Sequence, residues 1–324
     1  MTSTLDDYLQ DLWAEKWPGE GGQLNVQDMS AGFAYSIFGL PDGTFPPQST
    51  TIAPGPDTLQ NALLDVIRPM LQRNETFILK TPFEFARVPF IDAAHVFEKS
   101  GGQWIVLNYG LFGALYSVND RFLEILEVNS GIKKVDDPIE LVGRFPDLLC
   151  QFMLGECPNE KRWHVRMTTR VNPDLCHLIG TYTSVQQIFF LLHELGHAFY
   201  SHGIKMAHPF SSKFSVWQSG ESPAKAEKLA DAFAAEHLRS GPLPARLSDN
   251  PEAVVIGLFL LFESLELLRK LGKYSPGSHR LPRKRFKKMA KSIDRKSYKN
   301  LKKVLTSQQS LFDDVYTVWR INQN

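Results

Sequence analysis

Residues 188–199 read Ile-Phe-Phe-Leu-Leu-His-Glu-Leu-Gly-His-Ala-Phe. Apolar residues surround His193 and His197, which predicts a helix that is largely buried and carries both histidines. Because residues four apart project from the same helix face, the two imidazoles can bind one metal ion. Glu194 follows the first histidine, so its carboxylate can reach a water at the fourth position of such an ion. The stretch therefore predicts a helix built around a catalytic metal.

The ends and the crowding of this helix also follow from its residues. Ser184-Val-Gln-Gln187 matches a capping box, so the helix is expected to begin near Ser184. Gly196 carries no side chain at a crowded position, so another segment is expected to approach the helix there.

A second short stretch supplies an oxygen ligand. Residues 227–231 read Glu-Lys-Leu-Ala-Asp, inside a helix predicted over 223–238. Two histidines need a third protein ligand to hold zinc with one open position, and Glu227 can supply it. Asp231 shares its helix face and can accept a hydrogen bond from the other N–H of a ligating histidine. The alternative third ligands are His202, His208 and Glu221.

The pair of motifs, HELGH at 193–197 and EKLAD at 227–231, resembles the gluzincin metallopeptidases. Residues 233–238 (Phe-Ala-Ala-Glu-His-Leu) are similar to ImmA/IrrE-type peptidases. Residues 104–111 and Ser278-His279 are similar to Lit-type phage-exclusion peptidases. The resemblance covers roughly residues 100–285, with firm motifs only over 184–240. It implies a zincin-like metallopeptidase domain, one zinc ion per chain and hydrolysis of peptide bonds in a protein substrate.

In that reaction, Glu194 is expected to act as general base on a water activated by zinc. His279 is the expected second stabiliser of the oxyanion, with Tyr200 and Tyr274 as alternatives. An extended substrate is expected to pair with an edge strand formed by residues 163–171 or 176–183.

The composition is that of a globular protein: of 324 residues, 43% are hydrophobic and 22% are charged. Collagen-like, coiled-coil and wholly disordered classes are thereby excluded. Three cysteines without a Cys-x-x-Cys pair argue against a disulfide scaffold or a zinc knuckle. The first residues lack the features of a signal peptide, and the longest apolar stretch, 253–262, is about half of a membrane span. We therefore expect a cytoplasmic protein that does not associate with a membrane.

The expected elements give a helix-rich α+β fold with a small sheet, in which residues 103–107 form a buried strand. Residues 1–57 are predicted to be an N-terminal arm and a linker rich in proline and glycine. Residues 58–275 are predicted to be the zincin-like metallopeptidase domain, and 276–324 a basic, helical C-terminal segment.

Charge is distributed unevenly along the chain. The net charge is +1, but residues 280–303 hold twelve Lys and Arg and a single acid, Asp294. The remaining residues number 24 basic and 34 acidic. This segment is either a solvated helix face or a docking surface for an acidic partner or nucleic acid, although no nucleic-acid-binding motif accompanies it.

Two alternatives to a peptidase follow from these features. The first is a catalytically silent sensor that binds zinc, against which Glu194 argues because a silent site does not need a base. The second is a nucleic-acid-associated protein that acts through residues 280–303. A peptidase is expected to lose cleavage but keep zinc in Glu194→Gln, and to bind metal less well in Glu227→Ala. Charge reversal over residues 283–288 is expected to leave hydrolysis of a small peptide intact.

Overall fold

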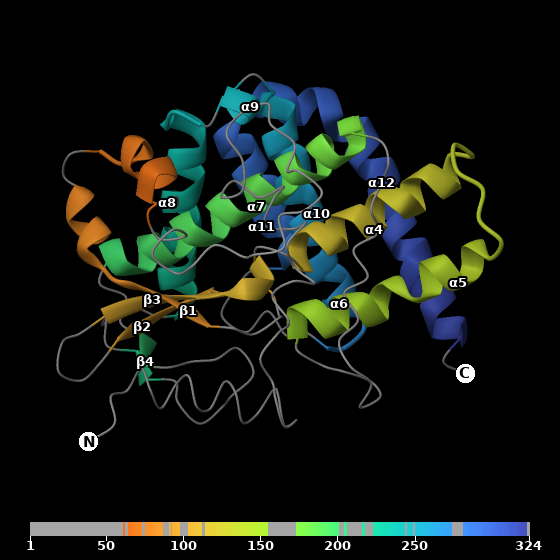
Figure 1. Ribbon diagram of the computed structural model, residues 1–324, viewed down its shortest axis with the longest axis horizontal. Coiled ribbons are helices and arrows are strands. Elements are labelled where there is room, and N and C mark those ends of the chain that lie inside the picture. Colours follow the sequence, from red (N-terminus) through yellow and green to blue (C-terminus); the bar gives the residue numbers. More distant parts are fainter. Residues whose placement is uncertain are drawn as a thin grey trace.

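The protein is mostly helical and carries a small sheet, which confirms the expected helix-rich α+β class (Figure 1). The structure is a computed structural model. It describes residues 61, 64–72, 75–86, 91, 93–97, 103–111, 114–154, 173–200, 204–205, 216–217, 223–243, 245–248, 250–273 and 281–322. The predicted N-terminal arm at 1–57 and the β-rich stretch at 163–171 lie outside the described residues.

Three strands and the short 3-10 helices occupy the first part of the described chain, two short strands lie between α7 and α8, and helices make up most of the rest. The strands are β1 (Phe83–Ala86), β2 (Ala93–Phe97), β3 (Gln103–Asn108), β4 (Ile204–Lys205) and β5 (Val216–Trp217). The 3-10 helices are η2 (Arg68–Met70), η3 (Thr76–Lys80) and η4 (Tyr109–Leu111). The α-helices are α4 (Ala114–Asn129), α5 (Pro138–Gly143), α6 (Phe145–Leu154), α7 (Pro173–Phe199), α8 (Pro223–Ser240), α9 (Ala245–Ser248), α10 (Pro251–Lys270), α11 (Pro282–Ile293) and α12 (Arg295–Asn322).

The three-stranded sheet has the order β1-β3-β2, and β3 confirms the strand predicted at 103–107. β3 pairs in parallel with β1 and antiparallel with β2. Ile105, Val106 and Leu107 are buried, as expected of a central strand. β2 is therefore an edge strand of this sheet, and it packs against α7.

The helix that carries both histidines, α7, is longer than its sequence predicts. It begins at Pro173, eleven residues before Ser184. The predicted cap at Ser184 is thus wrong: its hydroxyl donates to the carbonyl of Gly180 at 2.7 Å, a bond that serine also makes inside helices. The prediction of a strand at 176–183 is wrong for the same reason, because these residues belong to α7.

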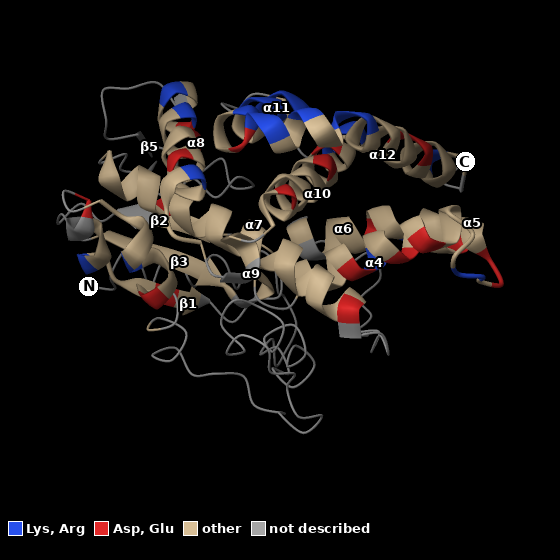
Figure 2. Ribbon diagram, turned by 90° about the horizontal axis from the view of Figure 1, so that it is seen from above, with Lys and Arg blue, Asp and Glu red and all other residues tan. Residues whose placement is uncertain are grey.

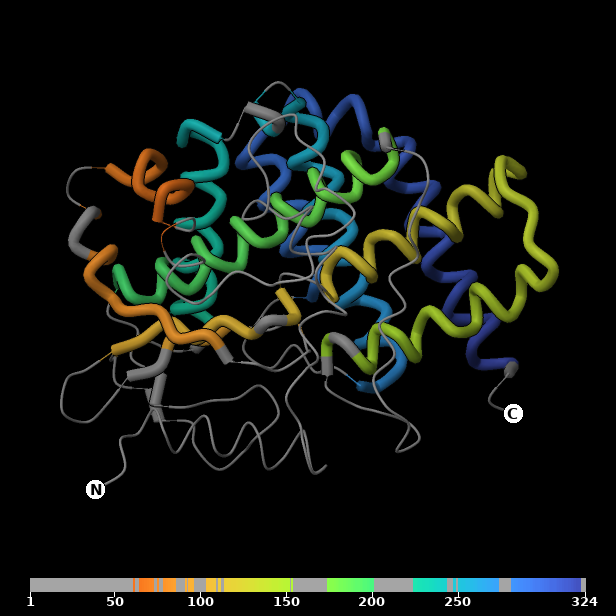
Figure 3. The backbone as a smooth tube through the Cα atoms, viewed as in Figure 1, coloured from red at the N-terminus to blue at the C-terminus, as the bar shows by residue number. Residues whose placement is uncertain are grey.

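α7 lies at the centre of the molecule and packs against α4, α8, α10 and β2. Figure 3 shows α7 (green) passing between the sheet and the C-terminal helices, with α8 (teal) crossing its C-terminal half. Among the described residues, only Asp174–Phe199 in α7 is long and apolar enough to cross a membrane. Because 78% of the most apolar 18-residue stretch of α7 is buried inside the protein, its apolar residues are those of a core helix.

The C-terminal helices share this core. α11 packs against α8 and α10, and α12 packs against α10. Phe286 and Met289 of α11 and Phe312 of α12 are buried in the main hydrophobic cluster. The basic segment therefore has one face inside the molecule and one face outside.

A buried contact between a histidine and a carboxylate links the residue before η3 to α8. The Nε2 atom of His237 lies 2.7 Å from the Oε2 atom of Glu75, and its Nδ1 atom lies 2.8 Å from the carbonyl oxygen of Phe233. The side chains of His237 and Glu75 are 2% and 10% exposed, so water cannot replace either partner.

We expect Glu75→Ala to destabilise the protein by about 3 kcal/mol, because it leaves His237 buried without its carboxylate. Chemical denaturation measures this loss of unfolding free energy. Glu236→Ala is the matched control, since Glu236 forms an exposed pair with Arg239 and its loss is expected to cost less than about 1 kcal/mol. Equal losses in the two variants would contradict the assignment of the buried pair.

Candidate metal centre

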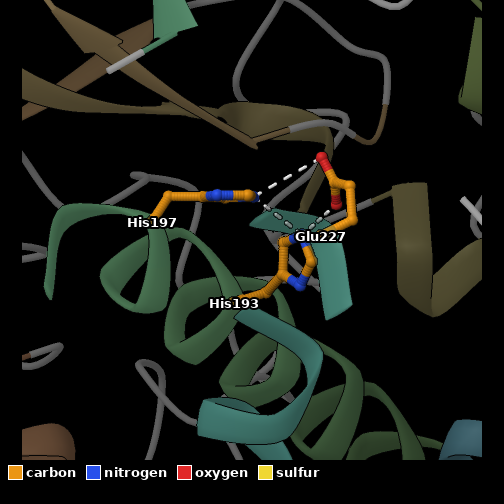
Figure 4. Close-up of side chains that lie close together, drawn as sticks. All are labelled: His193, His197 and Glu227. Carbon is orange, nitrogen blue, oxygen red and sulfur yellow. Dashed lines mark hydrogen bonds and ion pairs between the residues drawn. The ribbon is translucent and has the colours of Figure 1, made fainter. Parts of the chain in front are cut away.

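Two imidazoles from α7 and one carboxylate from α8 converge at a single point (Figure 4). The Nε2 atom of His193 lies 3.1 Å from Oε2 of Glu227 and 3.3 Å from Nε2 of His197. The Nε2 atom of His197 lies 3.6 Å from Oε1 of Glu227. All three residues are buried. The two sequence motifs therefore meet inside the protein, although His193 and Glu227 are 34 residues apart in the chain.

These separations fit a metal ion held by all three side chains. Metal–ligand bonds of about 2.0–2.1 Å in a tetrahedron place neighbouring ligand atoms about 3.3 Å apart. The observed distances of 3.1, 3.3 and 3.6 Å lie on either side of this value. A buried His-His-Glu group of this geometry can hold a metal ion.

The protonation of His193 also favours a cation at this point. Its Nδ1 atom lies 3.3 Å from Oδ1 of Asp231 and its Nε2 atom lies 3.1 Å from Oε2 of Glu227, so each ring nitrogen faces a carboxylate. Burial lowers the pKa of His193, but hydrogen bonds to Asp231 and Glu227 outweigh burial and raise it to about 10. The surrounding carboxylates thus stabilise positive charge, which a divalent metal supplies.

Asp231 is held in place by an arginine from the basic segment. The guanidinium of Arg285 in α11 donates to both carboxylate oxygens of Asp231, at 3.0 and 2.7 Å. Burial raises the pKa of Asp231, but Arg285 and then His193 outweigh burial and hold the pKa well below its usual range. Asp231 is therefore held as a carboxylate 3.3 Å from the Nδ1 atom of His193, and its role in orienting that ring stays a prediction.

Close packing of α7 on α8 brings the two motifs together. A Cβ atom on Gly196 would lie 3.0 Å from the Cα atom of Ala230 and 3.1 Å from the Cβ atom of Phe233. Glycine thus permits the close helix approach that its position in the sequence predicts.

Gly196→Ala is expected to destabilise the protein by about 1–3 kcal/mol, because the added methyl group meets the backbone of α8. The better helix propensity of alanine offsets only about 1 kcal/mol of this loss. Thermal unfolding of the metal-free protein measures the change. A higher melting temperature would show that α8 moves away freely and that Gly196 is not needed for the approach.

Glu194 lies beside the cluster and contacts the edge strand. Its Oε2 atom accepts a hydrogen bond of 2.8 Å from the backbone N–H of His95 in β2. Burial raises the pKa of Glu194, although His197 and His193 oppose this rise. A carboxyl group with a raised pKa is a better proton acceptor for catalysis near neutral pH.

A cavity of about 160 Å³ lies between α8 and α11. Glu227 and Asp231 line one wall, and Arg285 and Lys288 line the other. Open space therefore borders the residues of the metal centre on the α11 side.

Several residues named by the sequence lie outside the described part of the chain: His202, His208, Glu221, Tyr274 and His279. Tyr200 is described, and it is exposed at the end of α7. Sequence reasoning missed the parts played by Arg285 and the His95 amide. No local spacing links either residue to the motifs, and Arg285 was counted only as one charge in a basic run.

Comparisons of the chain with known protein families, with curated proteins and with solved structures found no match. The chemistry of the centre is therefore argued from its own residues.

Proposed function

We propose that this protein is a zinc-dependent metallopeptidase of zincin-like fold that hydrolyses peptide bonds in a protein substrate. The observation that carries the proposal is the position of Glu194, a buried acid that interacts with the charges of His193, His197 and Glu227 and accepts a hydrogen bond from the edge strand β2. Among the described residues the set holds three ligands, whereas structural zinc sites are closed by four protein ligands and need no buried acid beside them.

Zinc is the metal that best suits this set of ligands. Two imidazole nitrogens and one carboxylate form a known catalytic zinc set with one open position. Calcium and magnesium prefer sites made of oxygen atoms, so two histidines argue against them. The centre lies in a single chain, which gives one zinc ion per chain.

A bound zinc ion supplies a Lewis acid that lowers the pKa of water and polarises the scissile carbonyl. His193, His197 and Glu227 would hold the ion, and Asp231 would fix the ring of His193. Glu194 takes a proton from the attacking water and delivers it to the leaving amine nitrogen. His279 remains the proposed stabiliser of the oxyanion.

β2 is the strand that we propose for binding an extended substrate, in place of the two segments favoured by the sequence. It is an edge strand, and its backbone at His95 reaches the carboxylate of Glu194. A peptide added along β2 by backbone hydrogen bonds would lie beside the metal centre.

Metal analysis of the purified protein, followed by mapping of new peptide ends in a protein mixture, tests the proposal. We expect one zinc ion per chain and cleavage that stops with a zinc chelator and returns with added zinc. Bound zinc without any new peptide ends would favour the catalytically silent sensor. Cleavage that survives complete removal of metal would rule out a metallopeptidase.

Glu227→Ala is expected to lose most of its bound zinc, because the two histidines alone leave the ion with too few protein ligands. Elemental analysis after dialysis against a weak chelator measures the zinc that remains. Glu236→Ala is the control, because Glu236 is on the same helix but pairs with Arg239. Equal zinc content in both variants would exclude Glu227 as a ligand.

A further inference from the structure

α11 and the first half of α12 carry nine exposed basic side chains, which we call the basic face. Figure 2 shows Lys and Arg (blue) concentrated along α11 and at the start of α12. The nine are Lys284, Lys287, Lys288, Lys291, Arg295, Lys296, Lys299, Lys302 and Lys303. Among the described residues, no carboxylate forms an ion pair with any of the nine, and the ion pairs of α11 belong to Arg283 and Arg285. The basic face is therefore a surface of one sign.

The crowding of like charges opposes the stability of both helices. The first turn of α11 contains Arg283 and Lys284 and no acidic residue, although the N-terminus of a helix favours negative charge, whereas α12 has Asp294 at its N-terminus. Like charges also repeat three and four residues apart, which costs about 0.2–0.5 kcal/mol for each pair. The single acid between the helices, Asp294, is engaged by the backbone N–H groups of Lys296 and Ser297. An anionic partner would offset this cost.

We propose that the basic face docks a nucleic-acid duplex through its phosphate groups. Its cations follow one another along two consecutive helices separated only by Asp294, which suits a polymer with regularly spaced charges. Eight of the nine are lysines, which bind phosphates as point charges. This docking is independent of the proposed peptidase reaction.

The side chains between the cations favour a duplex over a single strand. Phe286 is buried in the core, and the ammonium of Lys291 lies 5.9 Å from the ring centre of Tyr298. Of the two aromatic residues between these cations, one is buried and the other is half-buried beside a lysine, so the basic face offers no row of open rings for stacking on unpaired bases.

The same surface is poorly suited to a protein or a lipid bilayer. Protein interfaces centre on large apolar or aromatic side chains and are depleted in lysine, whereas the large apolar residues exposed beside these cations, Leu281 and Val304, lie at opposite ends of the basic face. The apolar face of α11, with Phe286 and Met289, is buried in the core, so this helix cannot insert it into a bilayer.

Fluorescence anisotropy of labelled duplexes of mixed sequence, one DNA and one RNA, with the full-length protein tests the proposal. We expect affinity that falls linearly with the logarithm of salt concentration, with a slope of about −0.9 for each DNA phosphate contacted. Binding of either duplex supports the proposal and identifies the source of the phosphates. Failure to bind both duplexes at about 50 mM salt would overturn it.

The triple variant Lys287→Gln, Lys291→Gln and Lys299→Gln tests whether binding depends on the basic face or only on the net charge of the protein. We expect its binding to be weaker by about tenfold or more, with a slope shallower by about 2–3, because up to three phosphate contacts are lost. The control, Lys80→Gln with Lys134→Gln and Lys273→Gln, removes three exposed charges elsewhere and is expected to bind like the wild type. Equal loss in both variants would overturn the assignment of the basic face.

Three competitors test the class of partner. An unlabelled duplex is expected to displace the probe, whereas single-stranded oligonucleotide, poly-glutamate and vesicles containing phosphatidylserine are expected to displace it poorly. Tighter binding to any of these three would overturn the proposal in favour of a single strand, an acidic protein or a membrane. Because zinc binding and peptide cleavage do not enter these measurements, the result is independent of the proposed function.

Discussion

Glu194→Gln is expected to retain zinc and to lower kcat/KM for peptide cleavage by about 10²- to 10⁴-fold. The amide cannot accept a proton from the attacking water, but it has nearly the same size as the carboxylate. Its oxygen can still accept the 2.8 Å hydrogen bond from the backbone of His95. Parallel measurements of zinc content and of initial cleavage rate separate loss of the base from loss of the metal.

Glu266→Gln is a matched control for this substitution. Glu266 is also a buried glutamate, but it pairs with Arg269 in α10, away from the metal centre. We expect it to cleave at the wild-type rate. If Glu194→Gln kept full activity at full zinc content, another group would have to be the base.

Arg285→Met is expected to weaken zinc binding by about 10- to 100-fold, as the loss of groups that orient metal ligands does in other sites. Methionine fills much of the same space, but Asp231 loses its two hydrogen bonds from the guanidinium. The unfolding free energy of the metal-free protein is expected to fall by about 3 kcal/mol, since Asp231 is left largely buried without its partner. Competition with a chromogenic chelator and chemical denaturation measure the two effects.

Lys288→Met, one turn further along α11, is the control for this substitution. Lys288 is exposed and forms no ion pair with the described residues, so its change is expected to leave both zinc affinity and stability within about 0.5 kcal/mol of the wild type. Similar zinc affinity in Arg285→Met and Lys288→Met would show that Asp231 orients His193 without help from α11.

The ion pair of Arg285 changes one expectation from the sequence. Charge reversal over residues 283–288 is no longer expected to leave peptide hydrolysis unchanged, because it replaces Arg285 beside Asp231. It also replaces Arg283, which pairs with the buried Glu263 of α10. A neutral result is expected only when the change is limited to exposed lysines, such as Lys284 and Lys287.

The limits of sequence reasoning are visible in α7. The apolar pattern predicts the helix and its buried face, but not its start, because Ser184 and Gln187 make a capping pattern that the longer helix overrides. Ser184 bonds to Gly180 within the helix, and the side chain of Gln187 donates to the carbonyl of Leu111 at 2.8 Å. A bond inside the helix and a tertiary contact thus use the side chains that a cap would have used.

The sequence by itself determined which side chains face one another along each helix. Spacing of four residues places His193 with His197 and Glu227 with Asp231, because a helix turns once in 3.6 residues. Only the tertiary structure decided how the two helices cross, that the backbone of β2 reaches Glu194, and that α11 brings Arg285 to Asp231. These two contacts join residues that are 99 and 54 positions apart in the chain. Packing of the whole chain determines such partners, and local periodicity carries no information about it.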